Sequence, residues 1–321
     1  MNKRLLEMLS YKRPYNSTTE VNWIDRFIMP YGPEVLGEKD DPMVYLVTVK
    51  NPDGSEPNIL FSGHTDTMHH KPGRQKLVVD KIKGLISKND GEPLGADDAA
   101  GVWLLLEMID AEVPGVYSFP RGEERGGIGS SWFAKNCSTW LQRFDYAVAF
   151  DRKATDSIIT HQGCGMCCSN TFAEALGNAL NEHGDYFMYS PDDTGIYTDT
   201  AEYVDLIAEC TNVSVGYYSE HTENERLDVN HLTALRDACV KVNWSALPVV
   251  RRPGEDDFRS RYPTRGPVTT SVLDLTRDEM LWAIERDPDG FVDLLREELD
   301  LPEDDWYDYT GNSKPMNISK R

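Results

Sequence analysis

The sequence predicts an α/β protein in which a mixed, largely parallel sheet is sandwiched by helices. Short apolar segments rich in β-forming residues alternate with segments of helical spacing, which is typical of this class. Small and acidic residues directly follow several of the apolar segments. In such sheets functional groups collect beyond the strand ends, where loops converge on a rigid scaffold.

The first part of the chain predicts two helices followed by two strands. Leu5 to Leu9 has the pattern of an amphipathic helix. Ser17-Thr18-Thr19-Glu20 is a capping box and predicts the start of a second helix. Residues 44–49 predict a strand, Asn51-Pro52-Asp53-Gly54 a turn, and residues 58–62 a second strand.

The middle of the chain continues the alternation. An apolar helix is predicted over residues 99–108 and another helix from about Ser130. Buried strands are predicted over residues 116–119, 146–150 and 213–217. We therefore assign residues 1–247 to one large catalytic domain.

The character of the sequence changes after Leu247. Residues 248–272 contain several prolines and glycines and predict a linker or extended arm. Residues 273–321 predict a small C-terminal helical hairpin followed by a loose tail. The hairpin is too short to be stable alone. We expect it to pack on the main domain, or to form a homo-oligomer or bind a protein partner.

Composition restricts the possible partners. The formal net charge of −21 argues against nucleic acid and anionic membranes, because both repel a negative surface. The sequence contains neither the long apolar run of a membrane span nor a secretory signal. Its 6 cysteines are too few for a dense disulfide framework in a chain of this length. These features predict a cytoplasmic protein with reduced thiols.

Five segments carry, in order, the residue types that a two-metal hydrolytic site needs, and each follows a short run that predicts a buried strand. They are Gly63-His64-Thr65-Asp66, Gly95-Ala96-Asp97-Asp98, Gly122-Glu123-Glu124, Phe150-Asp151 and Glu220-His221. Histidine nitrogen and carboxylate oxygen without cysteine suit a pair of zinc ions, with cobalt or manganese as substitutes. The sequence thus predicts a metal-dependent hydrolase.

Each segment alone also has a structural interpretation. His64 and Asp66 face the same way on an extended strand, so one could bind metal while the other orients the imidazole ring. Alternatively, both could lie in a surface turn. Asp97-Asp98 could be an N-cap pair. Glu123 and Glu124 diverge, so one could bind metal while the other acts as general base, or both could be solvated.

The ordered set resembles the co-catalytic di-zinc exopeptidases, a group that includes zinc aminopeptidases, peptidase T and related amidohydrolases. Residues 61–67 look like the first metal motif of this group, and residues 94–101 like its bridging-aspartate motif. Residues 122–130 match its double-glutamate motif almost fully and are the most specific stretch. The resemblance covers roughly residues 1 to 245.

The resemblance implies a role for each site residue. His64 and Asp151 would bind one zinc, Glu124 and His221 the other, and Asp97 would bridge the two. Glu123 would be the general base that takes a proton from a water between the metals, and Asp66 would orient His64.

The spacing of the last two segments favours the compact aminopeptidase branch of the group. Only residues 152–220 separate Asp151 from His221, too few for the lid domain of peptidase T in addition to the core strands. The leading hypothesis is therefore a zinc aminopeptidase acting on peptides. The alternatives are an amidohydrolase that removes an acyl group from an amino acid or small metabolite, and a non-catalytic metal-binding scaffold.

Four further features lie outside these five segments. The cysteines Cys164, Cys167 and Cys168 are expected to be buried free thiols, because no second ligand pair completes a zinc site. His69 and His70 are expected in a solvent-facing loop. Thr198-Asp199-Thr200 receives no role, and Tyr217 either lines the substrate pocket or packs in the core.

Overall fold

The computed structural model describes residues 2–253 except 39, 164 and 185. The chain divides into two compact units, Met1–Pro263 and Thr264–Arg321, and all described residues belong to the first. The predicted C-terminal hairpin and most of the predicted linker lie outside the described residues. Within these, no helix combines the length and apolar character needed to cross a membrane.

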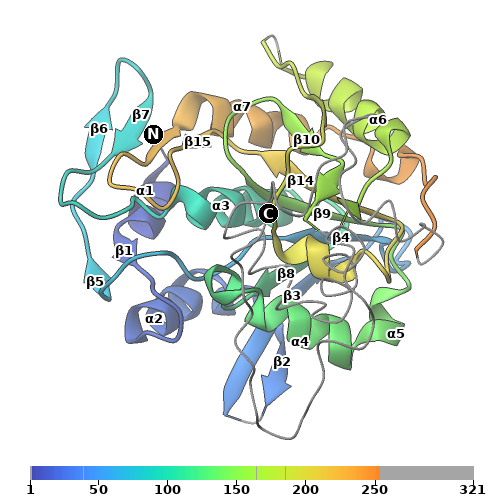
Figure 1. Cartoon of the computed structure of the whole chain (residues 1–321), viewed down its shortest axis with the longest axis horizontal. Helices are drawn as coiled ribbons and strands as arrows, with labels where there is room; N and C mark the ends of the chain where they lie inside the picture. The colour runs from blue at the N-terminus through green and yellow to red at the C-terminus, as the bar shows by residue number, and fades with distance from the viewer. Residues whose placement is uncertain (1, 39, 164, 185, 254–321) are drawn as a thin grey trace, which may run out of the picture. The chain divides into compact units, whose positions relative to one another are not determined.

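A mixed eight-stranded sheet forms the centre of the unit, which confirms the predicted fold class (Figure 1). Its order is β13 (Ser190–Asp192), β10 (Ser157–Ile159), β14 (Glu209–Ser214), β9 (Tyr146–Arg152), β4 (Ile59–Ser62), β8 (Gly115–Pro120), β3 (Asp41–Val49) and β2 (Glu34–Glu38). The middle strands β14, β9, β4 and β8 are parallel to one another. β3 and β2 continue the sheet as antiparallel strands.

The parallel strands are buried because helices cover both faces of the sheet. Every residue of β4, β8 and β14 is buried, as expected of apolar strands sandwiched between helical layers. The helices are α1 (Lys3–Leu9), α2 (Thr18–Phe27), α3 (Ala96–Asp110), α4 (Ile128–Asn136), α5 (Ser138–Leu141), α6 (Asn170–Asn181) and α7 (Val229–Cys239). Short 3₁₀ helices are η1 (Met29–Tyr31), η2 (Glu123–Arg125), η3 (Asp199–Tyr203) and η4 (Trp244–Ala246).

Helix α3 is the central helix of one layer. It packs on β4 and β9, while α1 and α7 pack against it in turn. Apolar residues surround it on all sides rather than forming one stripe, as expected of a helix buried in a core. The Asp98 carboxylate accepts a hydrogen bond from the Gly101 amide at 2.9 Å. The backbone is non-helical at Asp97 and Asp98, so Asp98 acts as the N-cap of the regular part of α3 that follows it, one of the two roles considered for the Asp97-Asp98 pair.

A smaller antiparallel sheet carries the last site segment. It consists of β15 (Tyr217–Tyr218), β16 (Arg226–Asp228), β7 (Leu85–Ser87) and β6 (Val78–Asp80). Two-stranded pairs join β1 (Tyr11–Lys12) to β5 (Gly73–Arg74) and β11 (His161–Gln162) to β12 (Gly165–Met166).

Two predictions about strands were wrong. The single strand predicted over residues 213–217 is split, because β14 ends at Ser214 and the chain turns at Gly216, where φ is +98°, to enter the smaller sheet. Asp97 and Asp98 do not follow a buried strand but lie at the start of α3. The Lys-rich stretch before them runs through β6 and β7 of the smaller sheet.

The contact between α3 and β9 predicts that Gly101 tolerates no side chain. A Cβ at this position would collide with the Phe150 carbonyl oxygen and the Asp98 carboxylate. We expect Gly101→Ala to lower the free energy of unfolding by about 2 kcal/mol or more, although alanine favours helix. Gly54→Ala is the control, because Gly54 has open space and only a positive φ of +83°. Urea denaturation should show a loss of about 1 kcal/mol there, and an equal loss in both variants would contradict the steric explanation.

Candidate active site

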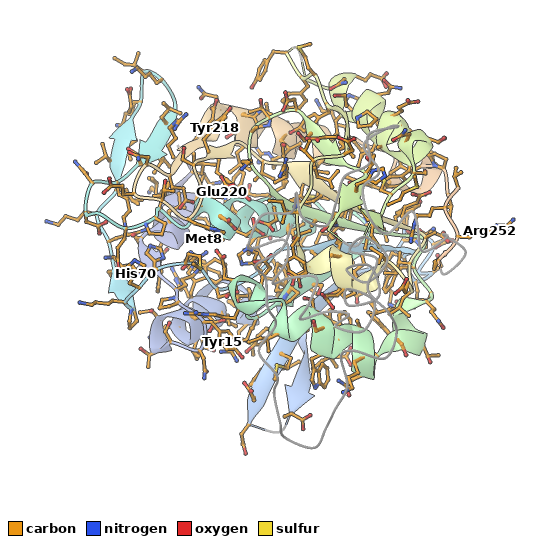
Figure 2. The ribbon with its side chains drawn as sticks, viewed as in Figure 1. Met8, Tyr15, His70, Tyr218, Glu220 and Arg252 are labelled. Atoms are coloured by element: carbon orange, nitrogen blue, oxygen red, sulfur yellow. The ribbon has the colours of Figure 1, made fainter. Side chains whose placement is uncertain are left out.

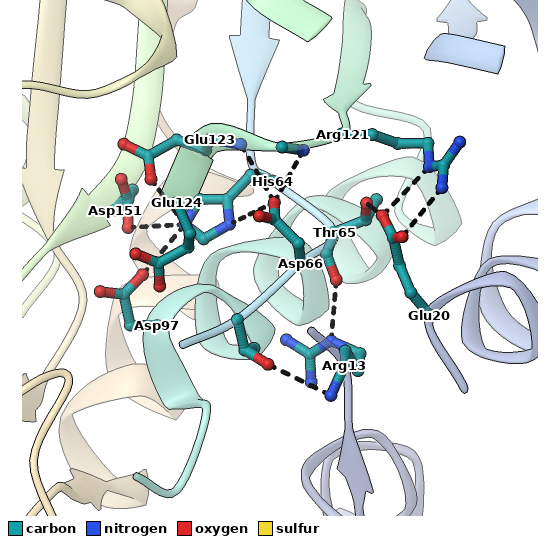
Figure 3. A network of polar contacts seen from close by, with 12 residues as sticks. Arg13, Glu20, His64, Thr65, Asp66, Asp97, Arg121, Glu123, Glu124 and Asp151 are labelled. Atoms are coloured by element: carbon teal, nitrogen blue, oxygen red, sulfur yellow. Dashed lines mark hydrogen bonds and ion pairs between the residues drawn. The ribbon is translucent and has the colours of Figure 1, made fainter. Parts of the chain in front are cut away.

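Four of the five segments lie together at one edge of the central sheet in Figure 3, and the fifth joins them through the contacts of His221 with Asp97 and Glu124. His64 follows the carboxyl end of β4, Glu123 that of β8, and Asp151 lies near the end of β9. These three strands are parallel, so their carboxyl ends share one edge. The start of α3 brings Asp97 to the same place, and the loop after β15 brings His221.

Asp97 lies between the two histidines of the site. Its Oδ1 is 3.0 Å from Nε2 of His64, and its Oδ2 is 3.0 Å from Nε2 of His221. Each histidine has a second carboxylate nearby: Asp151 Oδ1 lies 3.6 Å from His64, and Glu124 Oε2 lies 3.0 Å from His221. The structure thus brings together all five residues that the sequence suggested as metal ligands.

The donor atoms of the site fit divalent cations. Two sets of three donors lie within 4.8 Å of one another: His64 with Asp98 and Asp151, and His64 with Asp97 and Glu124. Asp98 Oδ2 and Glu124 Oε1 are buried and have no hydrogen-bond partner. Buried carboxylate oxygens are costly without a partner, and a set of imidazoles and carboxylates without thiolate suits zinc, cobalt or manganese. The sequence had not singled out Asp98 as a donor.

The close packing of buried acids changes the pKa of several carboxyl groups in the site. Burial raises the pKa of Glu123 well above its usual range; His64 opposes this, and Asp151 and Glu124 add to it. Burial also raises the pKa of Glu124 to about 7. For Asp97, burial is outweighed by hydrogen bonds from His221 and His64, which lower its pKa. The carboxylates therefore compete for the positive charge of the two histidines.

Asp66 connects the first segment to the third. Its Oδ1 accepts hydrogen bonds from the Gly122 amide at 2.9 Å and the Glu123 amide at 3.1 Å, and lies 3.5 Å from Nδ1 of His64. Asp66 is fully buried. One carboxylate thus faces the imidazole of His64 and holds the backbone of Glu123.

Asp151 is held by three residues that the sequence did not assign to it. Tyr217 donates its hydroxyl to Oδ1 at 3.0 Å, and Thr198 donates to Oδ2 at 2.8 Å. The Asn212 side chain bonds both the amide and the carbonyl of Asp151 at 2.8 Å each. The regular pairing of β9 with β14 shifts beside Asn212, so its side chain replaces backbone partners there.

A buried ion pair lies beneath the first and third segments (Figure 3). Arg121 donates to Glu20 through Nε at 3.1 Å and through Nη2 at 2.9 Å. Glu20 also accepts the Thr65 hydroxyl at 2.8 Å. Thr65 lies between His64 and Asp66, and Arg121 precedes Gly122, so Glu20 ties these two loops to α2. The sequence had suggested Glu20 only as a capping-box residue.

A second buried arginine links the first and second segments. Arg13 donates to the Thr65 carbonyl at 2.9 Å and reaches the Gly95 carbonyl at 3.5 Å. Its guanidinium lies 4.5 Å from the ring centre of Trp23. Burial lowers the pKa of Arg13 to about 10, although Asp98 and Asp66 act in the opposite direction. A cation beneath the acidic cluster offsets part of its negative charge.

His69 does not lie in a solvent-facing loop, so that prediction was wrong. His69 is buried, with Nδ1 at 2.7 Å from the Thr67 hydroxyl and Nε2 at 3.0 Å from Gln75 Oε1. Gln75 donates in turn to the carbonyls of Leu9 and Leu94, which joins the loop to the start of the chain. His70 is exposed as predicted, at the rim of the molecule (Figure 2).

The cysteines agree with the prediction where they are described. Cys167 and Cys168 are both buried, and Cys168 is a free thiol. Cys164 lies outside the described residues.

Solved structures with the same fold are aminopeptidases and related peptidases. Aminopeptidase PepT from Bacillus cereus is 15% identical, with 74% of this chain and 96% of that chain covered, at a TM-score of 0.59. A tripeptidase from Staphylococcus aureus is 14% identical, with 74% and 95% covered, at a TM-score of 0.59. The TET1 peptidase of Pyrococcus horikoshii is 17% identical, with 74% and 99% covered, at a TM-score of 0.51.

These likenesses confirm the fold that the resemblance implied: the chain has the fold of these peptidases. No protein-family model matches the sequence, and neither does any curated protein. The segment between Asp151 and His221, residues 152–220, forms strands β10, β13 and β14 of the central sheet. The same segment also forms the helices α6 and η3.

The ion pair under the site predicts a large and asymmetric effect on stability. Arg121→Met leaves the Glu20 carboxylate buried without its cation, so we expect unfolding free energy to fall by about 3–5 kcal/mol. Adding Glu20→Gln should restore part of this loss, and urea denaturation of both single variants and the double variant measures the coupling. Arg26→Met, which breaks the exposed pair with Glu7 at 3.1 Å, should have a much smaller effect. Additive losses at Arg121 and Glu20 would contradict the coupling.

The burial of His69 predicts a loss of stability in mild acid. Burial lowers its pKa to about 3, with Arg13 and Lys88 acting in the same direction. Below the ordinary pKa of about 6.5 the unfolded chain binds a proton that the folded chain does not, so stability falls as pH falls. We expect His69→Gln to reduce the slope between pH 6.5 and 5 by about 1 kcal/mol per pH unit in denaturation experiments. The exposed His70→Gln variant should keep the wild-type slope, and a matching change in it would contradict the assignment.

Proposed function

We propose that this protein is a metal-dependent aminopeptidase, which hydrolyses the amide bond next to a free amino terminus. One observation carries the proposal: the Asp97 carboxylate gives one oxygen to each of two histidines, and Glu123 lies beside the pair. That arrangement suits two cations held by one shared carboxylate. The peptidase fold of the chain agrees with it.

Two zinc ions are the proposed cofactors. His64 and Asp151 would hold one and Glu124 and His221 the other, with Asp97 shared between them. Once bound, such cations supply Lewis acidity that polarises the scissile carbonyl and acidifies water. Cobalt or manganese accepts the same donors.

Glu123 is the proposed general base. Its Oε2 lies 3.9 Å from Nε2 of His64, close to the ligand set, and its backbone amide is held by Asp66. A carboxylate in this place takes a proton from the attacking water and returns it to the leaving amine. Burial raises the pKa of Glu123, which makes its carboxylate a stronger base than an exposed glutamate.

The surplus of acids supports a substrate with a free amino group. Besides the proposed ligands and base, the fully buried Asp199 adds a carboxylate next to Thr198, and its Oδ1 has no hydrogen-bond partner. A protonated amine is attracted to such a site, whereas a substrate carboxylate is repelled. This favours an aminopeptidase over a deacylase, whose substrates carry a blocked amine and a free carboxylate.

Adjacent glutamates provide a matched test of the assigned roles. We expect Glu123→Gln to keep two zinc ions per chain while turnover falls about 10²–10⁴-fold, because it removes only the base. Glu124→Gln should instead lose about one zinc, because it removes a ligand. Elemental analysis and hydrolysis of aminoacyl anilides measure the two effects. Loss of metal in Glu123→Gln, or full metal in Glu124→Gln, would overturn the assignment.

The wild-type protein is assayed on the same anilides with free and with acetylated amino termini, and also on N-acetyl amino acids. Cleavage of the free form alone is the expected result. Cleavage of N-acyl amino acids alone would make the protein a deacylase, and no hydrolysis of any amide would leave a metal-binding scaffold.

A further inference from the structure

Glu225 is a buried carboxylate that is neither a proposed metal ligand nor the proposed general base. Its Oε1 accepts the amides of Ala96 at 2.7 Å and Asp97 at 3.1 Å, and its Oε2 accepts the amide of Gly95 at 3.0 Å. The residue is 1% exposed. All three hydrogen bonds therefore go to the turn that delivers Asp97.

These amides are the unsatisfied donors at the start of α3. The first amides of a helix have no partner within it, and a side chain at the N-cap normally accepts one of them. The backbone is non-helical at Asp97 and Asp98, so these amides belong to the turn before the regular part of α3, and this turn begins at Gly95, which has no side chain that could accept them. Glu225 takes this place from a distant part of the chain, and its charge suits the positive end of the helix dipole.

Because Glu225 accepts these amides, the Asp97 carboxylate does not have to. An aspartate at the start of a helix commonly turns its own carboxylate back onto the backbone amides. Here those amides are occupied by Glu225, and the Asp97 carboxylate instead faces His64 and His221 at 3.0 Å each. The direction of the shared ligand thus depends on Glu225.

Glu225 also belongs to the loop that carries His221. The Glu225 amide donates to the Thr222 carbonyl at 3.1 Å, and β16 begins at the next residue, Arg226. His221 has a φ of +62°, a strained conformation that persists only where its surroundings fix it. Anchoring Glu225 to the Gly95–Asp97 turn fixes the two loops that meet in the contact between His221 and Asp97.

We propose that Glu225 is a positioning residue of the metal centre, which orients Asp97 and sets the distance between the Asp97 and His221 loops. The inference rests on the proposed function, because it assigns Asp97 as the shared ligand. Glu225 touches none of the proposed ligands through their side chains, so it acts through the backbone. Groups of this kind tune metal affinity without contacting the metal.

Glu209 provides a matched control elsewhere in the fold. It is a fully buried carboxylate that also accepts three backbone amides, those of Ser169 at 2.7 Å, Val250 at 2.8 Å and Arg251 at 3.0 Å. It lies at the start of β14, beside Tyr146 at the start of β9 and therefore at the opposite end of that strand from Asp151. Glu209→Gln should cost stability as Glu225→Gln does, but at a distance from the metal centre.

The first measurement uses metal-free protein and needs no substrate. Hydrogen exchange of the Gly95, Ala96 and Asp97 amides should become faster in Glu225→Gln, because glutamine offers one acceptor oxygen and an NH₂ group that faces these donors. The same amides should exchange at the wild-type rate in Glu209→Gln. Unchanged exchange in Glu225→Gln would overturn the proposal.

The second measurement is the affinity for zinc, determined by competition with a chelator of known affinity. We expect Glu225→Gln to bind zinc about 10–100-fold more weakly than wild type, and Glu209→Gln to bind it normally. Equal weakening in both variants would show a general loss of structure and overturn the specific role. If Glu225→Gln does not fold, Glu225→Asp serves instead, and wild-type zinc affinity and exchange in that variant would overturn the proposal. Neither readout involves hydrolysis, so failure of the aminopeptidase assignment remains distinguishable.

Discussion

The structure depends on holding many carboxylates together out of water at one edge of the sheet. Buried acids raise one another's pKa and resist ionisation unless positive charge or hydrogen-bond donors surround them. The effect is visible at Asp98 and Asp151, where burial and neighbouring acids raise the pKa of each carboxyl. Three kinds of donor in the surrounding fold stabilise these carboxylates: backbone amides, hydroxyl groups and buried arginines. Many of these hydrogen bonds also join two separate segments of the chain. The same contacts therefore stabilise the buried charges and hold the site loops in place.

Hydrogen bonds from buried side chains link each site loop to the next. Asp66 connects the loops after β4 and β8 through the Gly122 and Glu123 amides. Arg13 connects the loop after β4 to the turn before α3, and Glu225 connects that turn to the loop of His221. Parallel strands place their ends at one edge but do not fix the loops beyond them. These cross-links supply that second level of order, and they use residues drawn from the beginning and the end of the described chain.

The residues that we propose for the chemistry were indicated by the sequence and lie together in the structure, whereas the residues that hold them in place could not be predicted. His64, Asp97, Glu123 and Glu124 belong to short motifs whose residue types are set by the chemistry of metal binding and proton transfer. Glu20 looked like an ordinary capping residue, because its pairing with Arg121 joins positions far apart in the sequence. His69 was wrongly placed in solvent because its partner Gln75 does not form a recognisable motif with it. Long-range side-chain pairing leaves no periodic signal, so local patterns predict the strands and helices but miss this support.

The two histidines of the site differ in how firmly they are held. His64 is 1% exposed, with Asp66 and Asp97 against its ring, whereas His221 is 45% exposed on a loop of the smaller sheet. The paired side chains of Lys153 and Glu220, 2.7 Å apart, lie beside the His221 loop and are also partly exposed. Within the described residues, the side of His221 is therefore the more exposed side of the site. Core packing holds an exposed loop less firmly than a buried strand end, and we therefore expect the His221 side of the site to depend on its buried anchor, Glu225, four residues away.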